Sequence, residues 1–220
     1  MKICGNFKHN IVVPTAENIK SKETNGFRVY STEDGDFYSV TTVTGWEKRN
    51  FFASWRNKNP EESKRVCKRG TDLHTLCEHY LLNNEINLED VEENERKLFE
   101  LLMPEINKIE EVYALETMLW GKITGLAGRV DCIAKYNGEL AIIDFKGSTK
   151  NKYKDDIDNY FLQATAYALL WQERTGTIIN KIVIMIATET GDLQVFEEKP
   201  MKYVRKLVDC IKKFKKDVNK

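Results

Sequence analysis

Residues Leu126 to Lys150 read LAGRVDCIAKYNGELAIIDFKGSTK, and this segment is the strongest indication of the fold. Its first part alternates between core-type and other residues, and Asn137-Gly138 is a strong signal for a tight β-hairpin turn. The part after the turn contains two adjacent isoleucines and then ends in charged side chains. We therefore expect two adjacent antiparallel strands with buried inner residues.

The charged end of the second strand has no obvious role in folding. Asp144 and Lys146 are two residues apart, and alternation places residues i and i+2 on the same side of a strand. A carboxylate and an ammonium group therefore lie side by side at the rim of a core strand. They form either a structural ion pair or part of a reaction centre. A D-x-K pattern alone favours the ion pair, because short patterns match by chance.

Asp131, on the first strand of the hairpin, adds a second carboxylate. The spacing Asp-x12-Asp-x-Lys lets Asp131 and Asp144 converge, because residues of adjacent antiparallel strands face one another. Two such carboxylates repel and shift towards their neutral forms unless a cation intervenes. Mg²⁺ prefers a few carboxylate oxygens and several waters. A lysine beside it can hold a water or stabilise charge on a phosphate.

The elements on both sides of this hairpin follow from periodicity and turn signals. On its C-terminal side we expect a helix over 155–175 that stops at Gly176, a buried strand KIVIMIATE, an edge strand LQVFE and a helix opened by Pro200. On its N-terminal side we expect a strand VYALETMLW, an acidic helix over 88–108 with a possible kink at Pro104, a helix from Pro60 to about Leu82, one or two helices over 42–59 and a hairpin around Asp34-Gly35.

This order predicts an α/β fold with a central mixed β-sheet, helices on both faces and a helical N-terminal elaboration. The chain of 220 residues with 41% hydrophobic residues is long enough for one sizeable core. We expect a single domain over 1–220, with a hairpin and helical part at about 24–108 and a catalytic core at about 109–220.

The charges and cysteines restrict the class of protein. Basic and acidic residues number 34 each, which argues against bulk electrostatic coating of DNA but leaves room for a local basic channel. The 5 cysteines contain no C-x-x-C spacing, which favours a reducing compartment and buried thiols. The start MKICGNFKHN has no hydrophobic signal segment, and the longest apolar run, 182–187, is too short to span a bilayer. We expect a soluble, cytoplasmic protein without membrane contact.

The long helix contributes two more candidates. His74 and Glu78 are four residues apart and share one helical face. They follow Gly70, where another backbone or a ligand can approach closely. A lone helical histidine is more often structural than functional, so this pair becomes informative only together with the carboxylates.

Further polar candidates lie on the strand before Asp131 and on the helix after the D-x-K strand. Glu116 is a third carboxylate, and Gln163 and Tyr167 share one helical face. The latter two form either a satisfied polar network or a contact to a nucleic-acid backbone.

Five segments, EDGDFYSVTTVTGW, RGTDLHTLCE, GLAGRVD, IDFK and QATAY, occur in this order. Together they resemble the PD-(D/E)xK nucleases of the RecB-like branch. The similarity is greatest to small single-strand exonucleases of the mitochondrial genome-maintenance type and their phage relatives, and it covers roughly 27–171. It implies a restriction-endonuclease-like core.

The resemblance also implies roles for the residues that match these motifs. Asp131 and Asp144, with the Phe145 carbonyl, would hold Mg²⁺ or Mn²⁺, and His74 would be a further ligand or orient the water of the metal. Lys146 would position the attacking water, so that Asp131, Asp144 and Lys146 form the catalytic set. The residues that would support this set are Glu78, Glu116, Gln163 and Tyr167.

For substrate binding, the resemblance implies that the segment after the D-x-K strand holds phosphates and that aromatic and basic side chains line the path of the strand. The residues concerned are Ser148, Lys150, Lys152, Arg69 and Trp55. Gly147 stands where relatives often carry threonine. Cys210 stands alone near the C-terminus, so no iron–sulfur cluster is expected.

The leading interpretation is a metal-dependent DNA exonuclease that prefers single-stranded ends, acts in DNA replication, repair or recombination, and works as a monomer. A phage origin is compatible with the resemblance. The aromatic and basic segment 42–69 could select strand ends. Two alternatives remain open: a nuclease for duplex ends or branched DNA, and a non-catalytic nucleic-acid-binding module on the same fold.

Overall fold

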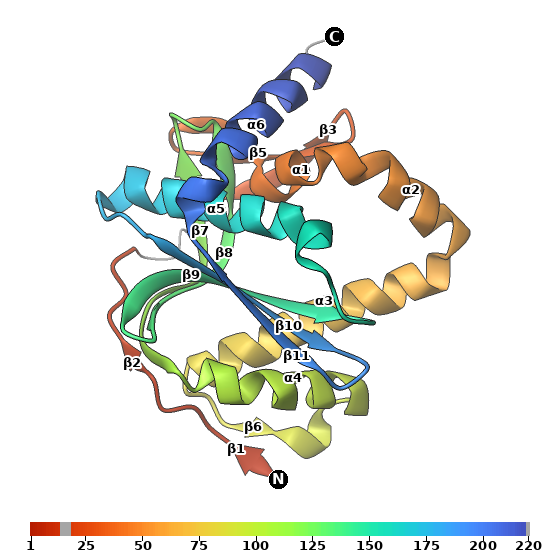
Figure 1. Ribbon diagram of the computed structural model, residues 1–220, viewed down its shortest axis with the longest axis vertical. Helices are drawn as coiled ribbons and strands as arrows, with labels where there is room; N and C mark the ends of the chain where they lie inside the picture. The colour runs from red at the N-terminus through yellow and green to blue at the C-terminus, as the bar shows by residue number, and fades with distance from the viewer. Residues whose placement is uncertain (14–18, 219–220) are drawn as a thin grey trace.

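Within the described part of the chain, the expected hairpin lies at the centre of a nine-stranded mixed β-sheet (Figure 1). The computed structural model describes residues 1–13 and 19–218. Strands β8 (Leu126–Tyr136) and β9 (Glu139–Ser148) pair antiparallel from Cys132 with Ile143 to Tyr136 with Glu139. Asn137 and Gly138 have φ values of 48° and 80°, as a two-residue hairpin turn of this kind requires.

The strands after the hairpin complete one side of the sheet. Strand β9 pairs in parallel with β10 (Lys181–Thr188), which pairs with the edge strand β11 (Leu193–Glu198). The crossover between β9 and β10 contains η3 (Lys154–Ile157) and α5 (Asp158–Thr175). Gly176, with φ of 74°, ends α5 in the left-handed conformation that favours glycine. These elements match the sequence prediction.

Strand β8 has two different partners on one of its edges. On the opposite edge it pairs with β7 (Ile109–Gly121) along its length. On the edge with two partners, β8 pairs in parallel with β5 (Gly35–Ser39) at Leu126 and Ala127. From Cys132 onwards the same edge pairs antiparallel with β9. Within the described chain, positions 128–131 therefore lie between two ladders, which leaves an opening in the sheet.

The N-terminal half supplies both strands and helices. The sheet continues from β5 to β4 (Phe27–Thr32) and β3 (Lys20–Thr24). The next elements are α1 (Val40–Thr44), η1 (Trp46–Lys48), α2 (Arg49–Lys58) and α3 (Pro60–Leu81). Helix α3 begins with proline and two glutamates, which suit the first turn of a helix. The segment 42–59 thus forms short helices, as expected.

Two expectations for this half need correction. The acidic helix is shorter than predicted: η2 (Leu88–Asp90) precedes α4 (Glu93–Ile106), because Glu92 has an extended backbone. The N-terminal part also contains short strands that were not predicted. In addition to β3–β5, β1 (Lys2–Ile3) pairs with β6 (Ile86–Asn87), and β2 (Lys8–His9) pairs with β7. Two-residue strands carry no periodic signal in a sequence.

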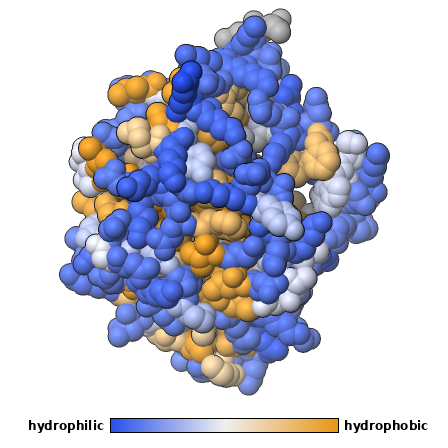
Figure 2. Space-filling view, viewed as in Figure 1, coloured by the Kyte–Doolittle hydropathy of each residue, from blue (hydrophilic) through white to orange (hydrophobic). Residues whose placement is uncertain are grey.

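Helices cover both faces of the sheet, as the fold class requires. One hydrophobic core lies between the sheet and helices α1, α5 and α6 (Val204–Val218), and a second lies between the sheet and helices α3 and α4. The surface in Figure 2 is largely hydrophilic, with hydrophobic residues in separate patches. In the described part of the chain, no helix is long and apolar enough to cross a membrane.

Candidate active site

The backbone is irregular beside the opening in the sheet. Glu116 on β7 has a φ of 45°, a conformation uncommon for a residue other than glycine. On β8, Val130 packs into the core under α5, whereas Cys132 packs into the core under α3 and α4. Residues two apart share a face in a regular strand, so β8 changes face at Asp131. Such local strain is often found at functional sites.

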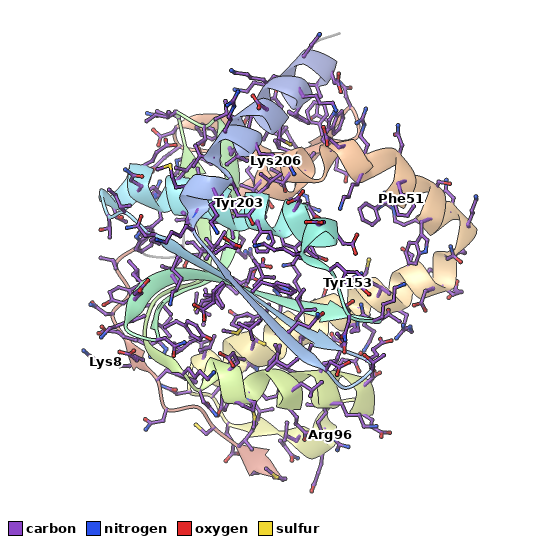
Figure 3. All side chains as sticks on the ribbon, viewed as in Figure 1. Lys8, Phe51, Arg96, Tyr153, Tyr203 and Lys206 are labelled. Carbon is purple, nitrogen blue, oxygen red and sulfur yellow. The ribbon has the colours of Figure 1, made fainter. Side chains whose placement is uncertain are left out.

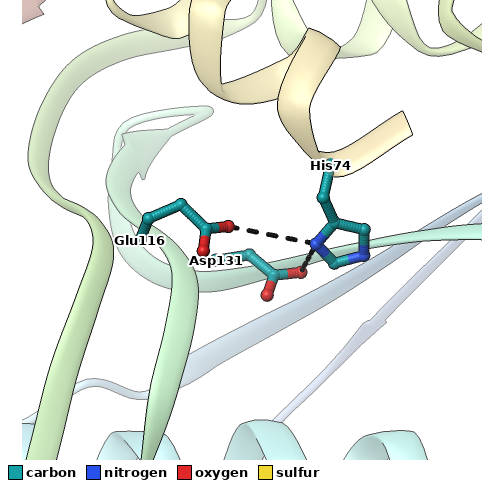
Figure 4. A group of neighbouring side chains, drawn as sticks. All are labelled: His74, Glu116 and Asp131. Carbon is teal, nitrogen blue, oxygen red and sulfur yellow. Dashed lines mark ion pairs between the residues drawn. The ribbon is translucent and has the colours of Figure 1, made fainter. Parts of the chain in front are cut away.

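Three potential metal ligands meet at this irregularity (Figure 4). His74 Nδ1 lies 3.5 Å from Asp131 Oδ2 and 3.9 Å from Glu116 Oε1. One ligand atom from each of the three residues lies within 4.8 Å of the others. Helix α3, strand β7 and strand β8 thus bring together two residues that the sequence nominated as ligands and one nominated as supporting.

The D-x-K pair lies on β9 next to this cluster. Lys146 Nζ donates to Asp144 Oδ1 at 2.6 Å, and Gln163 Nε2 donates to the same oxygen at 3.0 Å. The backbone N–H of Phe145 donates to Asp131 Oδ2 at 3.1 Å, which links the two strands. Asp144 Oδ2 is buried and has no hydrogen-bond partner among the described residues.

An unpartnered carboxylate oxygen in the interior costs free energy, so it requires an explanation. A divalent cation would satisfy Asp144 Oδ2 and reduce the repulsion between carboxylates. Carboxylate oxygens suit Mg²⁺ and Mn²⁺, and imidazole is a common additional ligand for transition metals. The donor set at this site therefore fits the divalent cation that the sequence predicted.

The electrostatics of the cluster reflect its burial and its excess of acids. Burial, together with the charge of Asp131, raises the pKa of Asp144 to about 6 against the opposing effect of Lys146. Burial lowers the pKa of His74, but Asp131 and Glu116 outweigh it and raise the pKa overall. Burial likewise lowers the pKa of Lys146, yet Asp144 and Asp131 raise it to a level at which the ammonium stays charged.

Helix α5 reaches the site from the far face, next to the opening in the sheet. Gln163 and Tyr167 line the same cavity as His74 and Asp131. A Cβ atom at Gly128 would lie 2.9 Å from Tyr167 Oη, closer than such contacts allow. Gly128 therefore leaves the space through which the tyrosine hydroxyl approaches β8.

The cavity over these residues has a volume of about 400 Å³. Several of its lining residues were not nominated from the sequence, namely Arg28, Tyr30, Ser39, Thr41 and Arg129. Ser39 and Thr41 belong to the first of the five motif segments, but strand periodicity did not indicate that β4 and β5 would lie beside β8.

The structure uses Arg69 differently from the prediction that it lines the path of DNA. Its side chain is 4% exposed and donates to Glu189 Oε1 at 2.6 Å, to the Gly147 carbonyl at 3.1 Å and to Thr149 Oγ1 at 3.2 Å. Arg69 therefore connects α3 to the end of β9. A Cβ at Gly147 would lie 3.3 Å from both Arg69 Nε and Leu73 Cδ2, so a side chain there would require these neighbours to shift slightly.

The nominated phosphate-binding residues Ser148, Lys150 and Lys152 lie at the end of β9 and in the segment that follows it, whereas Trp55 lies on α2. The Ser148 hydroxyl is buried and donates to the Lys150 carbonyl at 2.6 Å, so it closes the turn. The backbone of Lys152 is held by Gln194 through two hydrogen bonds. Lys150 is exposed, and Lys152 and Trp55 are half-buried.

Glu78 lies outside the ligand cluster. It lines a second hollow of about 420 Å³ beside α3, which shares His74, Glu116 and Arg129 with the first cavity. Its neighbours there are Gly70, Thr71 and Thr75. The nominated site residues thus fall into a central group, a supporting arginine and a neighbouring hollow.

A mixed sheet that brings Asp131, Asp144, Lys146 and a helical histidine together defines a class of nucleases. A model of the PD-(D/E)XK nuclease superfamily matches residues 48–198, more than half of the chain. The chain belongs to this superfamily, as the five motif segments predicted.

Particular relatives can also be named. The chain is 30% identical over 125 residues to mitochondrial genome maintenance exonuclease 1 of Mus musculus, and 29% identical over 132 residues to that of Homo sapiens. These alignments cover 56% and 58% of this chain but only 36% and 38% of the relatives. The chain thus spans little more than a third of the length of the curated relatives that it matches.

A solved structure from Eubacterium rectale, provisionally described as an exonuclease, is similar with a TM-score of 0.40 and 13% identity. The match covers 79% of this chain and 64% of that one.

Proposed function

We propose that this nuclease is a metal-dependent DNA exonuclease that hydrolyses phosphodiester bonds, prefers single-stranded ends and acts in DNA replication, repair or recombination. One observation carries the proposal: His74, Glu116 and Asp131 converge beside an Asp144–Lys146 pair that has an unpartnered carboxylate oxygen. The names of the mouse and human relatives support an action on strand ends.

The cation would be held by the side chains of His74, Asp131 and Asp144 and by the Phe145 carbonyl. Glu116 lies close enough to His74 to contribute a ligand or to hold the imidazole. When bound, Mg²⁺ or Mn²⁺ supplies Lewis-acid polarisation of the phosphate and lowers the pKa of water. The unpartnered Asp144 Oδ2 supports this assignment.

Lys146 has the properties that the reaction requires. Its ammonium group stays charged, and Asp144 fixes its position through a 2.6 Å hydrogen bond. It therefore offers a preorganised donor that can hold the attacking water or stabilise the charge that develops on the phosphate. Gln163 also donates a hydrogen bond to Asp144 Oδ1, which helps the carboxylate to keep its orientation while Lys146 acts.

The preference for single strands is supported by exposed aromatic side chains near basic ones. Phe51 on α2 is 67% exposed and Tyr153, in the segment after β9, is 81% exposed. Figure 3 shows both on the same side of the molecule. Bases of any sequence can stack on such side chains when they are unpaired. Neighbouring Lys150 adds positive charge for the backbone.

We also propose that residues 1–220 form one nuclease domain that acts as a monomer. Both hydrophobic cores pack on the same sheet, and the candidate ligands come from elements on both sides of residue 109. Neither part could form the site without the other.

The proposal can be tested with end-labelled DNA in three forms: linear single strands, linear duplexes and circular single strands. Each is incubated with Mg²⁺, Mn²⁺ or EDTA and with wild type or Lys146→Ala. We expect linear single strands to shorten only with metal and only with wild type, while circles survive. Cutting of circles would identify an endonuclease, and preferential duplex shortening would favour a duplex-end nuclease. Tight binding with no cleavage in any metal would favour the binding module.

A further inference from the structure

Two hollows meet at the candidate active site, and their charges differ. The cavity towards β4 and β5 and the hollow beside α3 share His74, Glu116 and Arg129. A strand with its scissile phosphate at this junction would extend its next phosphate into one of the two. Which hollow receives that phosphate depends on the groups that line it.

The hollow beside α3 is unfavourable for a phosphate. Glu78 and Glu116 both line it, and Arg129 is the one cationic side chain, apart from the titratable His74, among its described lining residues. Its remaining walls are Gly70 and two threonines. It lacks Arg28 and Lys146, whereas in the cavity towards β4 and β5 these two cations stand beside the carboxylates of Glu116 and Asp131.

The cavity towards β4 and β5 carries unused positive charge. Phe27 and Val29 are buried, so strand alternation places Arg28 and Tyr30 on the other face of β4. Among the described residues, the Arg28 guanidinium forms no ion pair and no side-chain hydrogen bond. Arg129 is 61% exposed, and its one ion pair among the described residues is with Glu116, at 3.9 Å.

Hydroxyl groups complete this wall of the cavity. Ser39 and Thr41 line it and lie 2.9 Å apart through their oxygens. Guanidinium groups bind phosphate oxygens through paired N–H donors, and hydroxyl groups add further donors. The wall therefore presents two guanidinium groups and the exposed hydroxyl of Thr41, which pairs with the buried hydroxyl of Ser39, next to the metal ligands.

We propose that Arg28 and Arg129, with the hydroxyl groups of Ser39 and Thr41, form the subsite for the phosphodiester next to the one that is cut. The base attached to this phosphate stacks on Tyr30. The inference rests on the proposed function, since it requires a DNA strand across the metal cluster. It deepens that function by assigning the path of the strand on one side of the reaction centre.

The test measures binding of short single-stranded oligonucleotides in which one phosphate is replaced by a neutral methylphosphonate, moved stepwise along the strand. Fluorescence anisotropy is recorded with Mg²⁺ in a Lys146→Ala background, and gels verify that the strand stays intact. Arg28→Ala and Arg129→Ala are compared with Arg205→Ala, which removes an exposed arginine on α6. Circular dichroism verifies that all variants are folded.

We expect a methylphosphonate at one position of the strand to weaken binding to Lys146→Ala. The same replacement should weaken binding little further when Arg28 or Arg129 has also been changed to alanine. Each of these two variants should reduce the slope of log affinity against log salt by about 0.7, the value for one contact to a single strand. Arg205→Ala should leave both measurements unchanged.

The outcomes separate the two proposals. If wild type cleaves single strands but Arg28→Ala and Arg129→Ala keep the position-dependent loss and the salt slope, the subsite is wrong and the proposed function stands. If no variant binds single strands and wild type does not cleave them, the substrate class is wrong and the subsite falls with it.

Discussion

Glu116 lies between two groups that the reaction would use in different ways. One carboxylate oxygen is 3.9 Å from His74, and the other is 3.9 Å from Arg129. Its left-handed backbone places the carboxylate at the junction of the two hollows. Such a conformation costs on the order of 1–3 kcal/mol, which the surrounding strands β7 and β8 compensate through their long ladder.

Gly128 lies so close to Tyr167 that one added methyl group should disturb the site. In Gly128→Ala, the new Cβ would meet Tyr167 Oη at 2.9 Å. The buried ring has little room to move, so we expect kcat to fall by about 10²-fold through displacement of the site. The loss should be smaller in a Tyr167→Phe background, which lacks the hydroxyl.

Steady-state kinetics of the two single variants and the double variant check this coupling. Gly70→Ala is the matched control, because its Cβ would have no atom within 4 Å and alanine favours helices by about 1 kcal/mol. Equal losses in both backgrounds would contradict the contact with Tyr167.

The raised pKa of Asp144 predicts how metal binding depends on pH. The Asp144 carboxyl group keeps its proton up to about pH 6. It must lose this proton before it can bind a cation. The increase in Tm on adding Mn²⁺ should therefore be full above pH 7 and decline as pH falls through 6. Without metal, the free energy of unfolding depends on pH in the opposite direction. The raised pKa of Asp144 in the folded state contributes stability at low pH, and this stability is lost as pH rises through about 6.

Thermal unfolding with Mn²⁺ or EDTA between pH 5 and 8 measures both effects. Asp144→Asn serves as the control, and its Tm should respond little to Mn²⁺ at any pH. An undiminished response of wild type at pH 5 would be incompatible with a metal site at Asp144.

At the scale of elements, Arg69 joins the helix that carries His74 to the strand that carries Asp144 and Lys146. It reaches the Gly147 carbonyl and Thr149 after β9, and Glu189 after β10. The turn between β10 and β11 is thereby tied to the same point. We regard Arg69 as a positioning residue, since its buried guanidinium does not face the cavity.

Arg69→Met should lower the free energy of unfolding by about 1–3 kcal/mol, because it takes a buried donor from the Gly147 carbonyl and from Thr149 Oγ1, while Glu189 keeps Arg65. Arg65→Met is the matched control. Arg65 binds the same Glu189 but is 44% exposed, so its loss should cost less than about 1 kcal/mol. Urea unfolding measures both values, and equal effects would contradict the role of burial.

On the scale of the whole molecule, one sheet carries the two large hydrophobic cores, and the site lies where the sheet opens. The split between β5 and β9 on the edge of β8 leaves 128–131 without a ladder on that side. Residues from α3 on one face and from α5 on the other therefore reach the same cavity. The β3–β5 layer closes its far wall.

Helix α2 is the part of this architecture that the cores support least. It has no buried residue, so its amides should exchange with deuterium faster than those of α5, which contributes ten buried residues to the core. If single strands stack on α2, a bound oligonucleotide should slow exchange over 49–58 and leave α6 unchanged. Hydrogen exchange is measured by mass spectrometry on Lys146→Ala in the presence of Mg²⁺, once with and once without the oligonucleotide. Unchanged exchange in α2 would remove it from the proposed path of the strand.

The sequence predicted the elements with strong periodicity and clear ends. The β8–β9 hairpin, α3 from its proline and α5 up to Gly176 were all correct. The acidic helix was predicted too long, because its charged residues continue through the extended backbone at Glu92. The short pairings of β1, β2 and β6 were missed, since they depend on contacts across the chain.

By itself, the sequence determined the superfamily, the hairpin and the candidates Asp131, Asp144, Lys146 and His74, because their order and local spacing are properties of the chain. Only the tertiary structure decided that Arg69 supports β9 and that Arg28 lies at the site. It also decided that Asp144 keeps an unpartnered oxygen. These facts depend on which strands share the edge of β8. Partners in a sheet are chosen by packing over the whole molecule, which no local pattern records.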